Sequence, residues 1–398
     1  MDDEEKGSVE RLFLPSLVFS YFATSPLAVL VSLLLIDIGN TFNVSVGVMG
    51  QINTLYSIVA VVFALLMGVL SVRFKHKSLL LVGLMLICTS ALGCLLALDF
   101  NAMLVSYSLS GLGWAMVSPM VVTLIGEHCP LEKRANAIGW SFAGGALAWV
   151  VGAPIVALIA GLGGWRLALI DFVIPILVVS LLLGFIGLPS TSRSHQPIVD
   201  GKTYLRSFES VFSNRSATAC LVGDVLRSAA FVAVYLYAAS FVRQRFLVSR
   251  DFASIVILGA ALCYTLGSLV GGRLVNRSGR KPSTVLTALL AGIFTISYAY
   301  VPNLWFSLSL IFVAAWFFGM VASASNTLTL EQVPEFRGTM MSIDTAAMNL
   351  GSALGTVLGG FVLLSFDYEG LGAALGLTGV AAAIVFHFLT IDPTCKRD

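Results

Sequence analysis

The sequence predicts an all-α membrane protein with twelve transmembrane helices, arranged as two pseudo-symmetric six-helix bundles, and with both termini in the cytoplasm. Composition is the first observation behind this prediction. Of the 398 residues, 58% are hydrophobic and 11% are charged, and the mean hydropathy is +0.93. So few polar side chains cannot cover a water-exposed surface. The other two observations are the lengths of the apolar runs and the distribution of basic residues between the loops.

The apolar residues are grouped into runs of about 20, which is the length of helix that crosses a hydrocarbon core of about 30 Å. The acidic start "MDDEEK" is unlike the basic start of a secretory signal peptide, so we expect the first run to be retained as a helix. The predicted spans are 12–36, 46–71, 78–98, 102–126, 136–160, 167–188, 216–240, 252–275, 283–301, 304–328, 338–364 and 370–391.

Basic residues favour one side of these spans. If the N-terminus is cytoplasmic, most of the 23 Lys and Arg residues fall in cytoplasmic loops or termini, as the positive-inside rule predicts. Arg227 lies within a span, and four arginines fall outside: Arg166, Arg243, Arg245 and Arg250.

The longest polar stretch divides the chain into two predicted domains, 1–188 and 216–398. We expect the connecting residues 189–215 to form a cytoplasmic linker. Its end, "KTYLRSFESVF", places apolar side chains on one helical face, which predicts a short amphipathic helix on the membrane surface. The residues on that face are Tyr204, Leu205, Phe208, Val211 and Phe212.

The two halves carry the same markers in one register. "GVLSVRFKHK" (68–77) resembles "GGRLVNRSGRK" (271–281), and "EHCPLEKR" (127–134) resembles "EQVPEFR" (331–337). Two markers that keep the same spacing indicate a duplicated six-helix unit, a common design among transporters. The positions that correspond at an offset of 204 are Gly68 and Gly272, Arg73 and Arg277, Lys77 and Lys281, Glu127 and Glu331, and Pro130 and Pro334.

Six spans plus six, a polar central loop and this glycine-basic motif resemble the major facilitator superfamily. In that family the motif is a gate element, whose charges bridge helix ends at the cytoplasmic face. The resemblance therefore implies a gate role, and the alternative is that the cations only set the topology. At the position where the family's loop motif has an acidic residue, this chain has Val72 in the first copy and Asn276 in the second. The family often has an arginine in span four, and this chain has Tyr107 at that place. The implied gate residues are Gly272, Asn276, Arg277, Gly279 and Arg280, with Gly68 and Arg73 in the first copy.

Span five carries a second resemblance. Gly152 and Pro154, in "GGALAWVVGAPIV", are similar to the antiporter motif of the drug:proton exporter branch, and "GWR" (164–166) is similar to the arabinose-efflux-like permeases of that branch. Pro154 is expected to kink its helix, because proline leaves a carbonyl unpaired. The alternative is ordinary packing of small residues.

Ionisable residues inside spans are costly and are therefore candidates for function. Asp224 and Arg227 lie three positions apart on one predicted helix, so their side chains can meet. We expect Asp224 to couple protons to transport by changing its protonation state when Arg227 moves away, and the alternative is a mutually neutralised pair kept by packing. Asp344, roughly 10 Å into its own span by helical rise, is expected to matter less, and Asp37 lies near an outer helix end.

By the same resemblance, spans one, four, seven and ten line the central cavity. They offer aromatic side chains and few charges, which suits an amphipathic or apolar solute. The alternative is that these rings face lipid or neighbouring helices. The candidate lining residues are Tyr21, Tyr107, Trp114, Phe231, Tyr235, Trp316 and Phe317.

The functional expectation is a secondary active transporter that exports a small organic solute by alternating access, driven by protons. An uptake permease or facilitator is the alternative, and a non-transporting receptor is a remote one. We expect no enzyme, because the chain has no H-E-x-x-H, G-x-S-x-G or P-loop motif. The scattered cysteines do not have the spacing of a metal site, and we expect no metal or cofactor. A net charge of only +2 gives no reason to expect binding to nucleic acid. The expected setting is the plasma or inner membrane, with the monomer sufficient.

Overall fold

The computed structural model describes the backbone of residues 3–129, 131–189 and 208–393, and all the regular elements in these ranges are helices. The chain forms two compact units. Unit 1 comprises Met1–Val44, Leu55–Pro197 and Arg250–Leu258, and unit 2 comprises Ser45–Thr54, Ile198–Ser249 and Gly259–Asp398. Two short segments therefore belong to the unit built mainly from the other half of the sequence.

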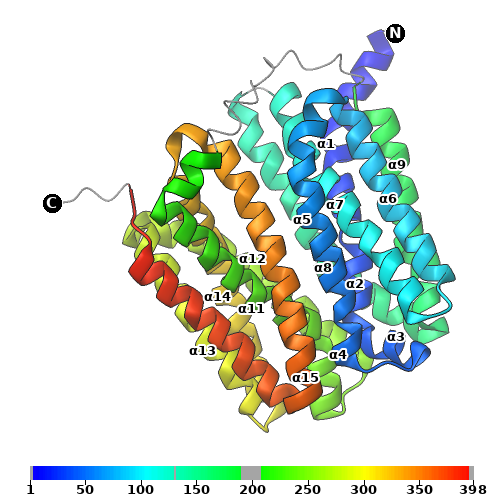
Figure 1. Ribbon diagram of the computed structural model, residues 1–398. Helices are drawn as coiled ribbons and strands as arrows, with labels where there is room; N and C mark the ends of the chain where they lie inside the picture. Colours follow the sequence, from blue (N-terminus) through cyan, green and yellow to red (C-terminus); the bar gives the residue numbers. More distant parts are fainter. Residues whose placement is uncertain (1–2, 130, 190–207, 394–398) are drawn as a thin grey trace. The chain divides into compact units, whose positions relative to one another are not determined.

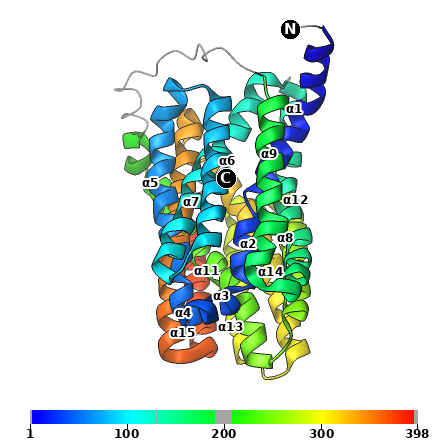
Figure 2. The ribbon, with the colours of Figure 1, turned by 90° about the vertical axis from the view of Figure 1, so that its right-hand side faces the viewer.

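Unit 1 is built on helices that run side by side (Figure 1). Within it, α6 packs against both α7 and α9, and α1 packs against α8 and α9 (Figure 2). Its elements are α1 (Asp3–Ala23), α2 (Pro26–Leu33), α3 (Leu35–Phe42), most of α5 (Gln51–Arg73), α6 (His76–Leu96), α7 (Phe100–His128), α8 (Leu131–Ala168), the π-helix Leu169–Val173 and α9 (Ile174–Gly187).

Unit 2 is centred on the packing of one long helix, α15, against α11 and α13. A short helix at residues 208–213 precedes α11, and its Val211 is buried among apolar residues of α11 and α15. The predicted amphipathic segment is thus docked on unit 2 where it is described, and residues 190–207 lie outside the described part. The elements are α4 (Val46–Met49), α11 (Arg215–Phe246), most of α12 (Arg250–Ser278), α13 (Arg280–Tyr300), α14 (Leu304–Leu330), the 3₁₀ helix Pro334–Phe336 and α15 (Arg337–Leu389).

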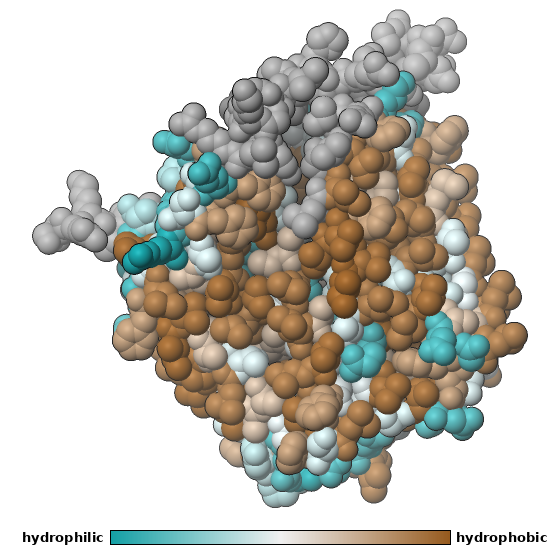
Figure 3. Space-filling model, viewed as in Figure 1, coloured by the Kyte–Doolittle hydropathy of each residue, from teal (hydrophilic) through white to brown (hydrophobic). Residues whose placement is uncertain are grey.

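Ten segments of the described chain are long and apolar enough to cross a membrane. Two of them, Ala137–Gly187 and Thr339–Leu389, have 51 residues each, more than twice the length that one crossing needs. The first is interrupted by non-helical backbone at Gly163 and Gly164, and the second at Asp367. Large apolar side chains such as Phe185 and Phe388 point outward, and apolar side chains cover much of the visible face (Figure 3). Such a surface is typical of a protein solvated by lipid.

The interruptions at Gly163–Gly164 and Asp367 fall between predicted spans, whereas the first span differs from its prediction. The first apolar run, expected as one helix over 12–36, is divided into α1, α2 and α3. Pro26 starts α2, where its missing N–H costs nothing, and Leu34 separates α2 from α3. The expected kink at Pro154 is not seen as a break, because helical dihedral angles continue through α8 until Gly163.

The structure keeps the register of 204 residues at the helix ends. α6 spans His76–Leu96 and α13 spans Arg280–Tyr300, so both ends of the two helices correspond at that offset. The next helix in each unit is also capped by corresponding residues. Asp99 accepts a hydrogen bond from the Ala102 amide (2.7 Å) and Asn303 accepts one from the Phe306 amide (3.1 Å). Each cap satisfies an amide that the first turn leaves unpaired.

Candidate functional site

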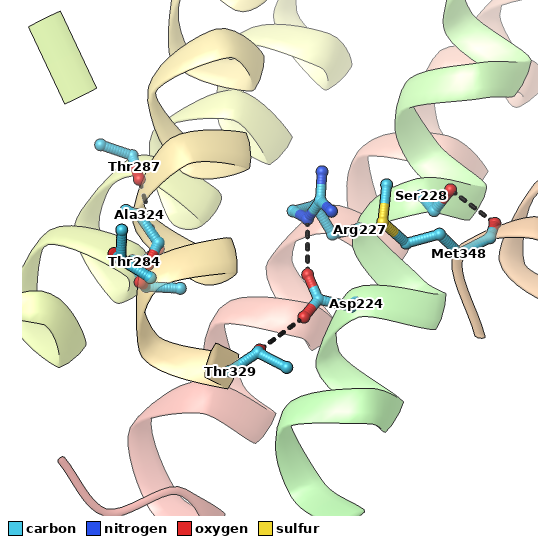
Figure 4. A network of polar contacts seen from close by, with 9 residues as sticks. Asp224, Arg227, Ser228, Thr284, Thr287, Ala324, Thr329 and Met348 are labelled. Carbon is cyan, nitrogen blue, oxygen red and sulfur yellow. Dashed lines mark hydrogen bonds and ion pairs between the residues drawn. The ribbon is translucent and has the colours of Figure 1, made fainter. Parts of the chain in front are cut away.

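A buried ion pair lies inside unit 2, on α11. Arg227 Nε donates to Asp224 Oδ1 at 2.9 Å, and the two side chains are among the most buried charged groups of the described chain. The second carboxylate oxygen of Asp224 accepts a hydrogen bond from the Thr329 hydroxyl of α14 at 3.0 Å. Figure 4 shows Asp224 between these two partners. The sequence predicts the contact between Asp224 and Arg227, and the structure adds the threonine.

Asp344 of α15 belongs to the same cluster. Its carboxyl is 1% exposed and is close enough to the Asp224 carboxyl for a hydrogen bond, while Arg227 also acts on it electrostatically. α15 is held beside α11 by backbone approach, since a Cβ on Gly351 or Gly355 would meet a carbonyl oxygen of α11 at 2.2 or 2.1 Å. The sequence does not predict this proximity, because the two acids lie on different helices and only the helix packing brings them together.

Aromatic side chains surround the arginine side of this cluster. Phe231, one turn after Arg227 on α11, stacks on Tyr264 of α12 with ring centroids 4.8 Å apart, and it also contacts Tyr235. Tyr264 interacts electrostatically with Arg227. Trp316 of α14 is half-buried, and its carbonyl oxygen faces Gly267 of α12. Of the four predicted unit 2 aromatics, Phe231 and Tyr235 therefore belong to the group that includes Tyr264, and Phe317 instead stacks on Phe294.

Unit 1 has an aromatic group of its own. Tyr107 of α7 is buried, and its ring lies 5.5 Å from that of Tyr56 on α5. Tyr21 of α1 packs against Phe142 of α8 at 5.1 Å, and it interacts electrostatically with Tyr56. Trp114 is half-buried on α7. The described part of unit 1 thus brings both Tyr21 and Tyr107 near Tyr56, a residue that the sequence does not single out.

The last lysine of the repeated motif makes the same contact in both units. Lys77 donates to the carbonyl oxygens of Phe185 and Leu188 at the end of α9, and Lys281 donates to the Thr390 carbonyl at the end of α15. A cation at a helix C-terminus satisfies carbonyls that have no partner in the helix and interacts favourably with the helix dipole. This contact explains why a positive charge recurs in the motif.

The motif also pairs with a glutamate of the following marker in each unit. His76 Nδ1 lies 2.8 Å from Glu127 in unit 1. At the corresponding positions of unit 2, Arg280 lies 3.9 Å from Glu331, which Arg337 approaches to 2.6 Å. An imidazole gains and loses its charge between about pH 5 and 8, whereas a guanidinium stays charged. The corresponding ion pair therefore has a histidine as its base in unit 1 and an arginine in unit 2.

The other gate candidates are less uniform. Gly279 has φ +85° at the start of α13, a conformation that favours glycine in the tight turn after α12. Gly272 does not show the close helix approach expected of it, because a Cβ there would meet nothing within 4 Å. Arg277 is exposed at the end of α12. The surroundings of Gly68 and the side chains of Arg73 and Asn276 lie outside what the structure describes.

Gly152 and Pro154 lie in the middle of α8. A Cβ on Gly152 would make ordinary contacts, at 3.6 Å, with Phe172 and Val29. Asp37 of α3 pairs with Arg250 of α12 at 3.0 Å within unit 1, and both side chains are partly exposed. Among the described residues no cluster of His, Cys, Asp and Glu has the arrangement of a metal site.

Sequence reasoning misses Thr329 and Tyr264, and no local signal marks them. Each is one polar or aromatic residue among many in an apolar helix, and its role comes from the helix that it faces. The register of the repeat could have paired His76 with Glu127 by correspondence with Arg280 and Glu331.

Comparison with known families gives matches over nearly the whole chain. The family model described as Major Facilitator Superfamily matches residues 14–247 and 225–397. Two curated relatives come from Bacillus subtilis (strain 168). The uncharacterized MFS-type transporter YceJ is 25% identical over 371 residues, covering 92% of this chain and 93% of the relative. The uncharacterized MFS-type transporter YwfA is 24% identical over 398 residues, covering 98% and 94%.

Solved structures share the fold at low sequence identity. The nucleoside transporter NupG aligns with a TM-score of 0.78 and 16% identity, covering 94% of this chain and 99% of that one. A D-xylose-proton symporter aligns with a TM-score of 0.76 and 16% identity, covering 96% of this chain and 97% of that one. A bacterial homologue of the human lysosomal transporter Spinster, in an inward-facing and unoccupied conformation, gives 0.75 and 16%, covering 98% and 96%.

Proposed function

The chain belongs to the Major Facilitator Superfamily, and from that premise we propose that it exports a small organic solute in exchange for protons. Membership makes it a multi-pass membrane protein and a secondary transporter of small molecules, and not an enzyme. Direction, coupling ion and solute class are the content of the proposal. The proposal also includes the topology, with twelve spans when each of the two 51-residue segments is counted as two. Both termini lie in the cytoplasm. The protein functions as a monomer in the plasma or inner membrane.

The buried cluster of Asp224, Arg227 and Asp344 is the observation that carries the proton coupling. Removing charged groups from water costs several kcal/mol per ion, and this cost often exceeds the Coulomb gain. Such a cluster is therefore a poor way to stabilise a membrane helix bundle, and buried acids inside membrane proteins commonly mark ion pathways. The aromatic rings of Phe231, Tyr235 and Tyr264 beside it support a solute with an apolar surface.

Export is supported by the resemblance of Gly152 and Pro154 to the antiporter motif. The corresponding place in the second half has Gly355 and Val357, so only one half carries the proline. The alternative is proton-driven uptake. It is favoured by one fact, that a proton symporter is among the proteins sharing this fold. A buried acid couples equally well in either direction, so the direction has to be measured.

The test is transport by the purified protein in liposomes with an imposed pH gradient. A panel of fluorescent amphipathic dyes serves as solute, and a pH-sensitive dye in the lumen reports proton movement. Export coupled to protons predicts that dye and protons move in opposite directions across the membrane. Asp224→Asn should lower gradient-driven accumulation to the level of empty liposomes while dye binding survives.

Two outcomes would contradict the proposal. Dye and protons that move in the same direction would make the chain a symporter. Gradient-driven transport by Asp224→Asn at the wild-type rate would remove the ion pair from coupling. Pro154→Ala is a second probe, since a proline that maintains tight exchange predicts a proton leak in this variant.

A further inference from the structure

The charges of the cluster do not balance. Asp224 and Asp344 offer two carboxyl groups, and Arg227 is the cation that acts on both. All three side chains are at most 2% exposed, so water does not compensate a net charge. If both acids were ionised, the cluster would carry a buried charge of minus one, which is expensive in a medium of low dielectric constant.

The remaining neighbours do not supply the missing positive charge. Cys220 on α11 interacts electrostatically with both acids and with Asp392 beyond α15, and Tyr264 on α12 interacts with Arg227. α14 contributes the neutral hydroxyl of Thr329. Within the described residues, Arg227 is the one cation among the groups that act electrostatically on Asp344 or Cys220, and those that act on Arg227 are Asp224, Asp344 and Tyr264.

Hydrogen bonding distinguishes the two acids. Both oxygens of Asp224 accept hydrogen bonds, from Arg227 and from Thr329, as expected of an ionised carboxylate. Asp344 has one oxygen, Oδ1, that finds no partner among the described residues. Its carboxyl nevertheless lies against that of Asp224, and two carboxylates cannot share a hydrogen bond without a proton between them.

From this arrangement we infer that Asp344 is the proton-binding residue of the transporter, and that Asp224 is the fixed counter-charge that positions Arg227. With the proton on Asp344 the cluster is neutral. Release moves H⁺ from the Asp344 carboxyl to water and leaves the cluster with a charge of minus one. That charge is tolerable only when water reaches the site, so proton release is tied to a conformation in which unit 2 opens here.

The inference rests on the proposed proton-coupled function but can be tested without transport. Above about pH 4 an unfolded aspartate has lost its proton, whereas the folded protein keeps the one on Asp344. The folded state then binds more protons than the unfolded state, so stability decreases as the pH rises. One extra proton changes the folding equilibrium about tenfold per pH unit.

The experiment is thermal unfolding of the full chain in detergent over a pH series from about 5 to about 8, compared between variants. Asp344→Asn keeps the Asp224–Arg227 pair and should remove the decrease in stability with rising pH. Asp224→Asn should leave Asp344 as the ionised partner of Arg227, so the decrease with rising pH should disappear in this variant too. Because it loses the carboxylate that accepts from both Arg227 and Thr329, this variant should be less stable than the wild type at about pH 5. Asp344→Asn mimics the protonated acid, so at about pH 5 it should match the wild-type stability, whereas Asp224→Asn should not. This difference identifies which of the two acids carries the proton.

Asp37→Asn is the matched control. Asp37 pairs with Arg250 in unit 1, where both side chains are partly exposed to water, so the wild-type pH dependence should persist in this variant. If Asp344→Asn keeps the wild-type pH dependence, the assignment is overturned. If the pH dependence is as expected but no pH gradient drives transport, the proton site stands and the proposed function fails.

Infrared spectroscopy of the wild-type protein decides the matter if Asp344→Asn does not fold. A protonated carboxyl has its own C=O stretching band, separate from that of a carboxylate. We expect this band at neutral pH, and we expect Asp344→Glu, which keeps the group and changes its position, to shift it. A wild-type spectrum that lacks the band at neutral pH would overturn the inference.

Discussion

Two adjacent glycines of the loop motif differ in what surrounds them. A Cβ on Gly271 would lie 2.6 Å from the Met320 carbonyl oxygen and 2.7 Å from the Met320 Cα, whereas a Cβ on Gly272 would meet open space. The close approach that glycine permits between α12 and α14 therefore depends on Gly271. The sequence motif instead emphasises Gly272, because motif positions are read from spacing and not from contacts.

This difference predicts opposite effects of the same substitution. Gly271→Ala should lower the free energy of unfolding by about 1–3 kcal/mol, because the Cβ overlaps backbone atoms that cannot rotate away. Gly272→Ala should leave stability unchanged or raise it by up to about 1 kcal/mol, since alanine is the better helix former. Thermal midpoints of the two variants in detergent are the measurement, and a destabilised Gly272→Ala would contradict the open surroundings seen here.

At the level of helices, the repeated motif is chiefly a set of ties between helix ends. Lys77 caps α9 and Lys281 caps α15, which are the last helices of the two halves. His76 and Arg280 each pair with a glutamate, at the end of α7 and of α14 respectively. Equivalent helix ends are thus held by equivalent charges inside each unit. Because these contacts hold the helix ends together inside each unit, we expect conformational change to occur elsewhere than at these ends.

Removing one tie should loosen one helix end. Lys281→Met deletes the hydrogen bond to the Thr390 carbonyl and should lower stability by about 1 kcal/mol, with faster amide exchange in the last turn of α15. Arg273→Met is the control, because Arg273 is an exposed cation of the same helix-end region. Equal exchange rates at the end of α15 in both variants would show that charge alone, and not the cap, matters.

At the level of the whole molecule, the charge distribution predicts which helix ends face the cytoplasm. On a background without the six native cysteines, Asn101→Cys should react with a membrane-impermeant maleimide in intact cells. Ser213→Cys should react only after permeabilisation. Both side chains are exposed, so reactivity reports the side of the membrane. Labelling of Ser213→Cys from outside would reverse the topology given by the positive-inside rule.

The sequence by itself determined the class of the protein and its duplication. Hydrophobic burial is non-directional and scales with apolar area, so composition and run length suffice to identify membrane helices. Repeated spacing likewise survives in the structure, where both ends of α6 and α13 correspond at the offset of 204. The contact between Asp224 and Arg227 was also predictable, because residues three apart on a helix are neighbours by geometry.

Tertiary structure alone decided what the polar groups do. Thr329 lies 105 positions after Asp224, and Asp344 lies on yet another helix, so neither contact follows from local spacing. The division of the first predicted span into α1, α2 and α3 was likewise not predictable from its apolar run. Hydrogen bonds and backbone approach are directional and act within a few ångströms, so they depend on which helix faces which and at what rotation. Only the packed bundle fixes those relations, and with them the acid that we infer carries the proton.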